Sequence, residues 1–290
     1  MRFVLTLIAD RADTALTPAV IARVRDVAGG GDAVLLSPGE AVDIPLAASP
    51  EMAAIRAAID GAAIDAIVTT TAHRRKQLLV ADMDSTIVTG ETLDELADFA
   101  GLKDRIAAIT ARAMNGELDF KAALRERVAM LRGLPVDALQ RTWQRVQLTP
   151  GARELVMTMH AGGAYTALVS GGFSFFTARV AAACGFDLHR SNILLDDGVA
   201  LLGRVAEPIL DRDSKLIALT GLASERGLEL EATLAVGDGA NDLDMLHAAG
   251  LGVAFHARPV VAATAKARVD HANLRALLFA QGYRADEIVG

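Results

Sequence analysis

Residues 78–86, with the sequence LLVADMDST, constrain the fold of this chain more than any other stretch. Four apolar residues are followed at once by Asp82 and Asp84, so that an apolar run ends abruptly in two carboxylates. A short apolar run bounded by polar residues is typical of a strand that is buried on both faces of a parallel sheet. Ligands of open α/β sheets bind beyond the carboxyl ends of such strands, so we expect Asp82 and Asp84 to lie at a ligand site.

The spacing of these two aspartates favours a bound cation. They are two residues apart, so in an extended chain their side chains point the same way and their like charges lie close together. Mg²⁺ is the typical partner, because it binds one or two carboxylates and keeps its other positions for waters or phosphate oxygens. The D-x-D spacing also occurs in calcium loops and in ordinary solvated turns, in which Asp84 would cap the next helix.

Composition narrows the class of protein. With 290 residues, 52% of them hydrophobic and 22% charged, the chain is typical of a globular protein large enough for two domains. A net charge of -7, with no basic cluster larger than residues 74–76, argues against a nucleic-acid surface. No apolar run approaches the roughly 18 residues of a membrane span, so no membrane partner is expected. The single cysteine, Cys184, excludes an internal disulfide and indicates a reducing, cytoplasmic location.

The first part of the chain alternates between strand and helix periodicity. We expect strands at residues 3–8, 33–36, 41–46 and 64–70, and helices at 17–27 and 49–59. This order of elements is the split βαβ arrangement of ferredoxin-like α+β domains.

The same pattern is similar to that of ACT modules, which implies a homodimer formed through this part of the chain, or amino-acid sensing. A plain packing module is the alternative. The polar run at residues 72–76 is interpreted as a solvated linker, which leads into the strand at 77–81.

A helical segment separates the strand at 77–81 from the next core strand. We expect helices at residues 92–99, 103–114, 120–131 and 136–146, because glycine, asparagine and proline interrupt the pattern between them. A helical insert at this point, over about residues 90–148, indicates a cap that covers the site and excludes water.

Three residues of this insert are candidates for contact with a substrate. Glu91 could bind an ammonium group, Arg127 could form a forked contact with a carboxylate, and Phe120 could flank the ligand. Each has a structural alternative: Glu91 stabilises a helix N-terminus, Arg127 belongs to a solvated face, and Phe120 packs in the core of the cap.

Two later segments carry phosphate-binding features. The strand at 165–169 ends at Ser170 and Gly171, where small residues allow backbone N–H groups and a hydroxyl to approach a phosphate. An ordinary tight turn is the alternative. Lys215 lies in the first turn of a helix at 213–223, where the helix dipole disfavours a cation, so it needs an anionic partner or exposure to solvent.

The strand at 234–236 repeats the pattern of the first stretch. It ends in residues 237–242, with the sequence GDGAND. Asp238 is placed to share a cation with Asp82, and Asp242 to orient that cation or its waters. An acidic helix cap is the alternative, and it explains Asp242 better than Asp238.

Together, these four segments resemble the haloacid dehalogenase (HAD) superfamily of aspartate-nucleophile phosphotransferases. Residues 82–86 match its first motif, Ser170 its second, Lys215 its third and residues 237–242 its fourth. Over residues 77–280 the chain is similar, within that superfamily, to the phosphoserine phosphatases.

The resemblance implies an α/β fold, with a HAD-type, Rossmann-like parallel sheet core and a small helical cap, preceded by a ferredoxin-like or ACT-like α+β domain. The expected domains are residues 1–73 and 74–290, with the cap at about 90–148.

The resemblance also implies chemical roles. Asp82 would be the nucleophile that accepts the phosphoryl group, and Asp84 would protonate the leaving oxygen and later activate a water. The Asp82 carboxylate, the Asp84 backbone carbonyl and the Asp238 carboxylate would hold Mg²⁺, with Asp242 behind them. The phosphoryl group would be stabilised by Ser170, Gly171 and Lys215.

The remaining site residues concern the serine part of the substrate. Glu91 would bind its ammonium group and Arg127 its carboxylate, while Phe120 and Met114 shape the pocket and Asn241 lies near the phosphate. The implied reaction is hydrolysis of O-phospho-L-serine, the last step of serine biosynthesis. The alternatives are a phosphatase or phosphotransferase for another small monoester such as phosphohomoserine, and a catalytically silent amino-acid-binding regulator.

Overall fold

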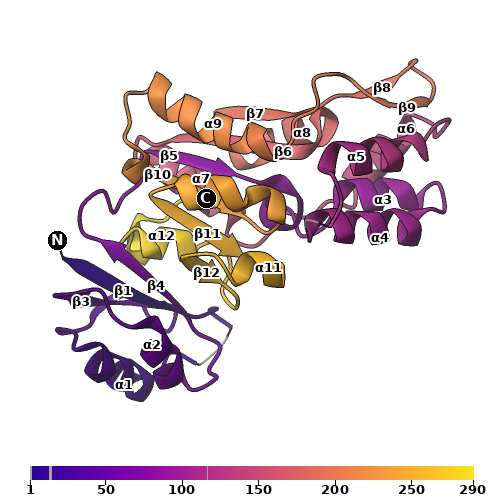
Figure 1. Ribbon diagram of the computed structural model, residues 1–290. Helices are drawn as coiled ribbons and strands as arrows, with labels where there is room; N and C mark the ends of the chain where they lie inside the picture. The colour runs from indigo at the N-terminus through magenta and orange to yellow at the C-terminus, as the bar shows by residue number, and fades with distance from the viewer. Residues whose placement is uncertain (1, 13–14, 116) are drawn as a thin grey trace.

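The computed structural model describes residues 2–12, 15–115 and 117–290, which form a six-stranded sheet, a four-stranded sheet, a two-stranded hairpin and a helical layer (Figure 1). The larger sheet has six parallel strands in the order β12-β11-β10-β5-β6-β7. Its strands are β5 (Leu78–Ala81), β6 (Tyr165–Phe173), β7 (Leu188–Asn192), β10 (Thr233–Gly237), β11 (Leu251–Phe255) and β12 (Ala267–Val269).

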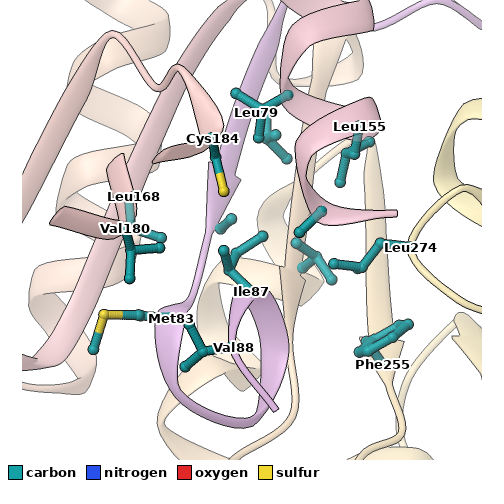
Figure 2. Close-up of a cluster of buried hydrophobic side chains, with 14 of the residues drawn as sticks. Leu79, Met83, Ile87, Val88, Leu155, Leu168, Val180, Cys184, Phe255 and Leu274 are labelled. Carbon is teal, nitrogen blue, oxygen red and sulfur yellow. The ribbon is translucent and has the colours of Figure 1, made fainter. Parts of the chain in front are cut away.

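Helices cover both faces of this sheet because alternate residues of each strand point to opposite sides. Leu79 packs on one face with α7 and α8, as Figure 2 shows, and Leu78 packs on the other face with α9 and α10. The covering helices are α7 (Ala152–Ala161), α8 (Ser174–Cys184), α9 (Arg212–Glu225), α10 (Leu243–Ala248), α11 (Pro259–Ala262) and α12 (Ala276–Ala280). All four residues of β5 are buried, so the expected strand, buried on both faces, is confirmed.

The segment between β5 and α7 forms the helical layer at one end of the sheet (Figure 1). It contains α3 (Thr92–Asp98), α4 (Lys103–Met114), α5 (Phe120–Ala129) and α6 (Asp137–Trp143). The segment that leads into the helical layer and the segment that leads out of it lie side by side, because Val88 and Leu148 form an antiparallel bridge.

A hairpin from the core also joins this layer. Its strands are β8 (Leu194–Asp196) and β9 (Leu201–Val205). The backbone N–H of Gly133 donates to Leu201 O at 2.9 Å, and the N–H of Val136 donates to Val199 O at 2.9 Å. The hairpin is therefore bonded to the helical layer through backbone groups.

The first part of the chain forms a separate antiparallel sheet with the order β2-β3-β1-β4. Its elements are β1 (Phe3–Ile8), α1 (Pro18–Ala28), β2 (Val34–Ser37), β3 (Ala41–Leu46), α2 (Met52–Ile59) and β4 (Asp65–Thr70). The predicted fold class, a parallel α/β sheet preceded by a ferredoxin-like α+β sheet, is confirmed. No helix of the described residues has the length and apolar character that a bilayer crossing requires.

This four-stranded sheet does not pack by itself. Helices α1 and α2 cover one face, and the other face packs against α12, which comes from the C-terminal end of the chain. Ile8 and Ile67 of the small sheet belong to the same buried cluster as Leu277 and Phe279 of α12. One hydrophobic core therefore extends from the large sheet into the small one.

Buried polar contacts reinforce this junction. The Asp65 carboxylate, 4% exposed, accepts the backbone N–H groups of Asp270, His271 and Ala272 at 2.7, 3.2 and 2.8 Å. Glu40 forms a buried ion pair with Arg275, with Oε1 2.7 Å from Nε. The edge strands β4 and β12 are thus held side by side.

The basic residues 74–76 were expected to form a solvated linker. This expectation is wrong for Arg74 and Lys76. Arg74 forms an ion pair with Asp43 at 2.7 Å, and its side chain is only 17% exposed. Lys76 is buried and donates to Glu231 O at 2.6 Å, and burial lowers the pKa of Lys76 to about 8. These cations are part of the packing between the two sheets.

We predict that Asp65→Ala lowers the free energy of unfolding by about 3 kcal/mol, because it leaves three buried backbone donors without an acceptor. Urea denaturation measures the change. Asp32→Ala, at an exposed position, is the control and should change stability by less than about 0.5 kcal/mol. Equal stability of the two variants would contradict a structural role for Asp65.

Candidate active site

The candidate site lies where β10, β5 and β6 end next to one another. Because parallel strands present their carboxyl ends at the same edge, residues far apart in sequence meet there. A single cavity at this edge is lined by nine of the predicted residues, namely Asp82, Asp84, Glu91, Phe120, Arg127, Ser170, Gly171, Asp238 and Asn241. Lys215 and Asp242 lie directly behind this lining.

The turn after β5 aims two acidic side chains into the cavity. The turn spans Met83–Ile87 and is closed by the backbone N–H of Val88, which donates to Met83 O at 2.9 Å. Within it the backbone of Asp84 is extended, and Ser85 has a φ of 54°, a conformation that is uncommon for a residue other than glycine. Asp84 Oδ1 accepts the backbone N–H of Thr92 at 2.8 Å, and Ser85 Oγ donates to Glu91 Oε1 at 2.8 Å. The turn thereby fixes Asp84 and Glu91 relative to each other.

Lys215 joins two carboxylates at the centre of the site. Its Nζ lies 2.6 Å from Asp82 Oδ1 and 2.5 Å from Asp242 Oδ1, and all three side chains are buried. Although burial alone would lower it, the pKa of Lys215 is raised by the charges of Asp242 and Asp82. The lysine therefore stays charged and holds the two aspartates together.

The site still contains more negative than positive charge. Oxygen atoms of Asp82, Asp238 and Asp242 all lie within 4.8 Å of one another, and the three residues are buried. Burial raises the pKa of Asp82 to about 7 and raises that of Asp238 well above its usual range. Buried carboxylates that resist ionisation in this way fit a site for a hard divalent cation, which would compensate their charge.

Asp242 is less available to such a cation than the other two aspartates. Its Oδ1 contacts Lys215, and its Oδ2 accepts the backbone N–H of Gly239 at 3.0 Å. The carboxylate of Asp84 is not one of the three that lie close enough together to hold a metal ion. This agrees with the sequence-based expectation, in which Asp84 binds the metal through its backbone carbonyl and not through its side chain.

Asp84 has a different environment. Its burial, followed by the nearby charge of Glu91, raises the pKa of Asp84 well above the ordinary range. At neutral pH this carboxyl therefore keeps its proton more readily than an exposed aspartate does, which suits a proton donor.

On the side of the helical layer, Arg127 presents a buried guanidinium to the cavity. Its Nε donates to Ala123 O at 3.1 Å, and its Nη1 donates to Thr110 Oγ1 at 2.9 Å. Thr110 in turn donates to Asp94 Oδ1 at 2.7 Å. Burial lowers the pKa of Arg127 and raises that of Glu91, so each would gain from an oppositely charged ligand.

The glycines of the Ser170-Gly171-Gly172 segment are required by close contacts. A Cβ at position 171 would lie 2.5 Å from Phe120 Cζ, and one at position 172 would lie 2.9 Å from Asp84 Oδ2. The backbone N–H of Gly172 donates to Ser170 Oγ at 2.9 Å. Asn192, at the end of β7, holds the other side of this segment by donating to Gly171 O at 2.8 Å.

Several residues of the site were missed by the sequence analysis. Leu93, Leu124, Gly172 and Phe173 also line the cavity, while Thr110, Asp94 and Asn192 support its lining. Gly172 and Phe173 belong to the segment that begins at Ser170, whose small residues indicated a phosphate site, although no role was predicted for either residue. The other five residues follow no chemical motif in the sequence. The predicted pocket residue Met114 has a side chain that lies outside the described part of the structure.

Comparison with known proteins identifies the class. Residues 79–247 match the family of haloacid dehalogenase-like hydrolases, and the chain belongs to this family. Within it, the chain is 44% identical to a phosphoserine phosphatase from Archaeoglobus fulgidus, over 71% of this chain and 60% of that protein. It is also 43% identical to a phosphoserine phosphatase from Lactococcus lactis, over 70% of this chain and 94% of that protein.

Solved structures show similar folds. A HAD family hydrolase from Salmonella enterica serovar Typhi has a TM-score of 0.84 and 30% identity, and covers 96% of this chain and 97% of its own. A phospho-aspartyl intermediate analogue of a phosphoserine phosphatase has a TM-score of 0.67 and 37% identity, over 71% of this chain and 98% of that chain. The chain thus spans less than two thirds of the A. fulgidus relative, but nearly the whole length of these two structures.

We predict that the affinity for a divalent cation falls as the pH decreases through about 7. A carboxylate must lose its proton to bind a metal, and the pKa of Asp82 is raised to about 7. Below that pH, each ligand that must deprotonate costs about tenfold in affinity per pH unit. Calorimetric titration with Mg²⁺, in buffers of different ionisation enthalpy, measures the affinity and the protons released. A constant affinity from about pH 8 to about pH 6 would contradict the prediction.

Proposed function

We propose that this protein hydrolyses O-phospho-L-serine to L-serine and phosphate through an aspartyl-phosphate intermediate, the last step of serine biosynthesis. One observation carries the proposal: a single cavity is lined by the aspartates of the sheet edge and by the oppositely charged pair Glu91 and Arg127. A phosphomonoester of an amino acid matches both groups of residues: its phosphate would lie at the sheet edge, and its ammonium and carboxylate groups would lie at Glu91 and Arg127. The identity to phosphoserine phosphatases supports this choice of substrate.

In this proposal Asp82 attacks the phosphorus and forms the intermediate, which divides one difficult hydrolysis into two steps. Asp84 donates its proton to the serine oxygen as that oxygen leaves. It then accepts a proton from the water that attacks the intermediate. The raised pKa of Asp84 supports the first of these roles, since the group must begin in its protonated form.

Asp82, Asp238 and the backbone carbonyl of Asp84 would hold Mg²⁺, which supplies positive charge for the phosphoryl oxygens and for the crowded carboxylates. Asp242 would support the site from behind, through Lys215. Lys215, Ser170 and the Gly171 amide would bind the phosphoryl oxygens, and Asn241 would lie beside them. The buried Oδ1 of Asn241 accepts no hydrogen bond among the described residues, so it would accept one from a donor in the site, such as a water or the ammonium group of the substrate.

At the end of the cavity away from the phosphoryl group, Glu91 would bind the ammonium group of the substrate and Arg127 its carboxylate. Phe120 would pack against the substrate between them, together with Met114. The cavity has a volume of about 30 Å³, room for one or two waters, so its lining must rearrange to admit phosphoserine, and we propose that the helical layer moves.

We also propose a division into residues 1–73 and 74–290, with the cap at about 90–148. The first domain would serve as the dimerisation surface of a cytoplasmic homodimer.

Phosphate release from phosphoserine, with and without a chelator, tests the activity directly. The expected result is release that stops with the chelator and returns with Mg²⁺. A panel containing phosphohomoserine and other small monoesters tests the substrate, and phosphoserine should react fastest. No release from any monoester would favour a regulator, and transfer of phosphate to a second alcohol would favour a phosphotransferase.

We predict that Asp82→Asn lowers kcat by about 10⁴-fold or more, since the amide cannot form the intermediate. Steady-state phosphate release measures kcat, and circular dichroism verifies the fold. Asp213→Asn, at an exposed position in the first turn of α9, is the control and should retain its activity. Turnover of Asp82→Asn at the control rate would remove the nucleophile assignment.

We predict that Arg127→Ala lowers kcat/KM for phosphoserine by about 10²- to 10³-fold, the cost of losing one partner of a buried charge pair. O-phosphoethanolamine has the ammonium but no carboxylate, so its kcat/KM should change by less than about threefold. Arg125→Ala is the matched control, because this exposed arginine lies on the same helix and pairs with Glu207. Equal losses for both substrates would show that Arg127 has only a structural role.

A further inference from the structure

A second cavity lies at the junction of the two sheets, away from the candidate active site. It has a volume of about 200 Å³ and lies between the α2 and β4 region of the small sheet and the segment around β12 of the large sheet. Figure 1 shows the positions of these three elements. We call it the junction cavity. Its lining includes Arg56, Ile59 and Ile64 from the first part of the chain, and Lys266, Arg268 and Asp270 from the last part.

One wall of the junction cavity is apolar. Ile59 and Ile64 are buried residues of the core of the small sheet, and Met52 and Ala66 pack beside them. Burial of an aliphatic group against this wall would be favourable by the hydrophobic effect.

The charged groups of the lining leave an excess of positive charge. The Asp65 oxygens already accept three backbone N–H groups, and Asp270 pairs with Arg268 at 2.7 Å. Arg56 and Lys266 line the same cavity from the two sides of the junction; both are exposed to solvent, and neither has an ion pair within the described residues. Both nearby carboxylates are thus occupied, while two cations still lack a partner.

We propose that the junction cavity binds a small aliphatic monocarboxylate, with its carboxylate between Arg56 and Lys266 and its hydrocarbon part against Ile59 and Ile64. A cavity of 150 Å³ holds the six carbons of benzene, so about 200 Å³ has room for about eight non-hydrogen atoms. An acid of about six carbons has this size. The site is independent of the proposed catalytic activity.

The same charges disfavour a free amino acid at this position. An α-ammonium group would lie next to the two cations, and the carboxylates that could compensate it are already bonded. The junction cavity therefore selects an acid without an amino group, which distinguishes it from an amino-acid sensor.

The test is a titration of the full-length protein, in the presence of Mg²⁺, with 4-methylpentanoate, followed by two-dimensional ¹H–¹⁵N NMR. The expected result is saturable shifts of the backbone amides of residues 61–66 and 266–271, with a Kd of about 1 mM. Leucine and 4-methylpentanamide, which have the same hydrocarbon part, should shift these amides at least about fivefold more weakly. Amides of residues 170–172 report on the candidate active site and should not move.

Arg56→Ala combined with Lys266→Ala should weaken binding by about tenfold. Arg105→Ala combined with Arg190→Ala removes two exposed arginines elsewhere, gives the same net charge, and should bind as the wild type does. The absence of shifts at 61–66 and 266–271, equal binding of the amide, or unchanged binding by the Arg56 and Lys266 variant would each overturn the proposal. Shifts at 170–172 alone would place the acid in the catalytic cavity instead.

Discussion

The buried contact of Lys215 with Asp82 and Asp242 is the interaction on which the rest of the site depends. Each aspartate follows a different strand of the parallel sheet, and without a cation between them their charges would repel each other in a region from which water is largely excluded. The lysine reaches them from the first turn of α9, a position that the helix dipole disfavours. The two carboxylates more than offset that cost, so the sheet edge can carry several acids and remain folded.

The sequence predicts this part of the structure well because its signals are local. An apolar run that stops at a carboxylate marks both a buried strand and the edge where its ligand residues lie, as at Asp82 and Asp238. From its place in the helix, Lys215 was expected to have either an anionic partner or exposure to solvent, and in the structure it contacts two carboxylates. The helices of the insert were predictable because glycine and proline mark their ends.

The parts that the sequence does not predict depend on distant partners. Arg74 and Lys76 form a typical solvated run until their acceptors are known, and these belong to residues 31 and 155 positions away. Thr110 and Asn192 support the site through single hydrogen bonds, and neither residue type indicates that role. Strand β7 has the sequence LHRSN without an apolar run, because it is an edge strand and is only partly buried.

The backbone bonds between the β8–β9 hairpin and the loop at residues 133–136 have a mechanical consequence. Two separate parts of the chain are joined into one layer, so any movement of this layer relative to the sheet would have to bend the backbone at four places: before α3, after α6, and at both ends of the hairpin. The first two of these places lie next to each other, because Val88 and Leu148 form an antiparallel bridge. A substitution in the hairpin, remote from the candidate active site, would therefore act on the movement of the whole layer.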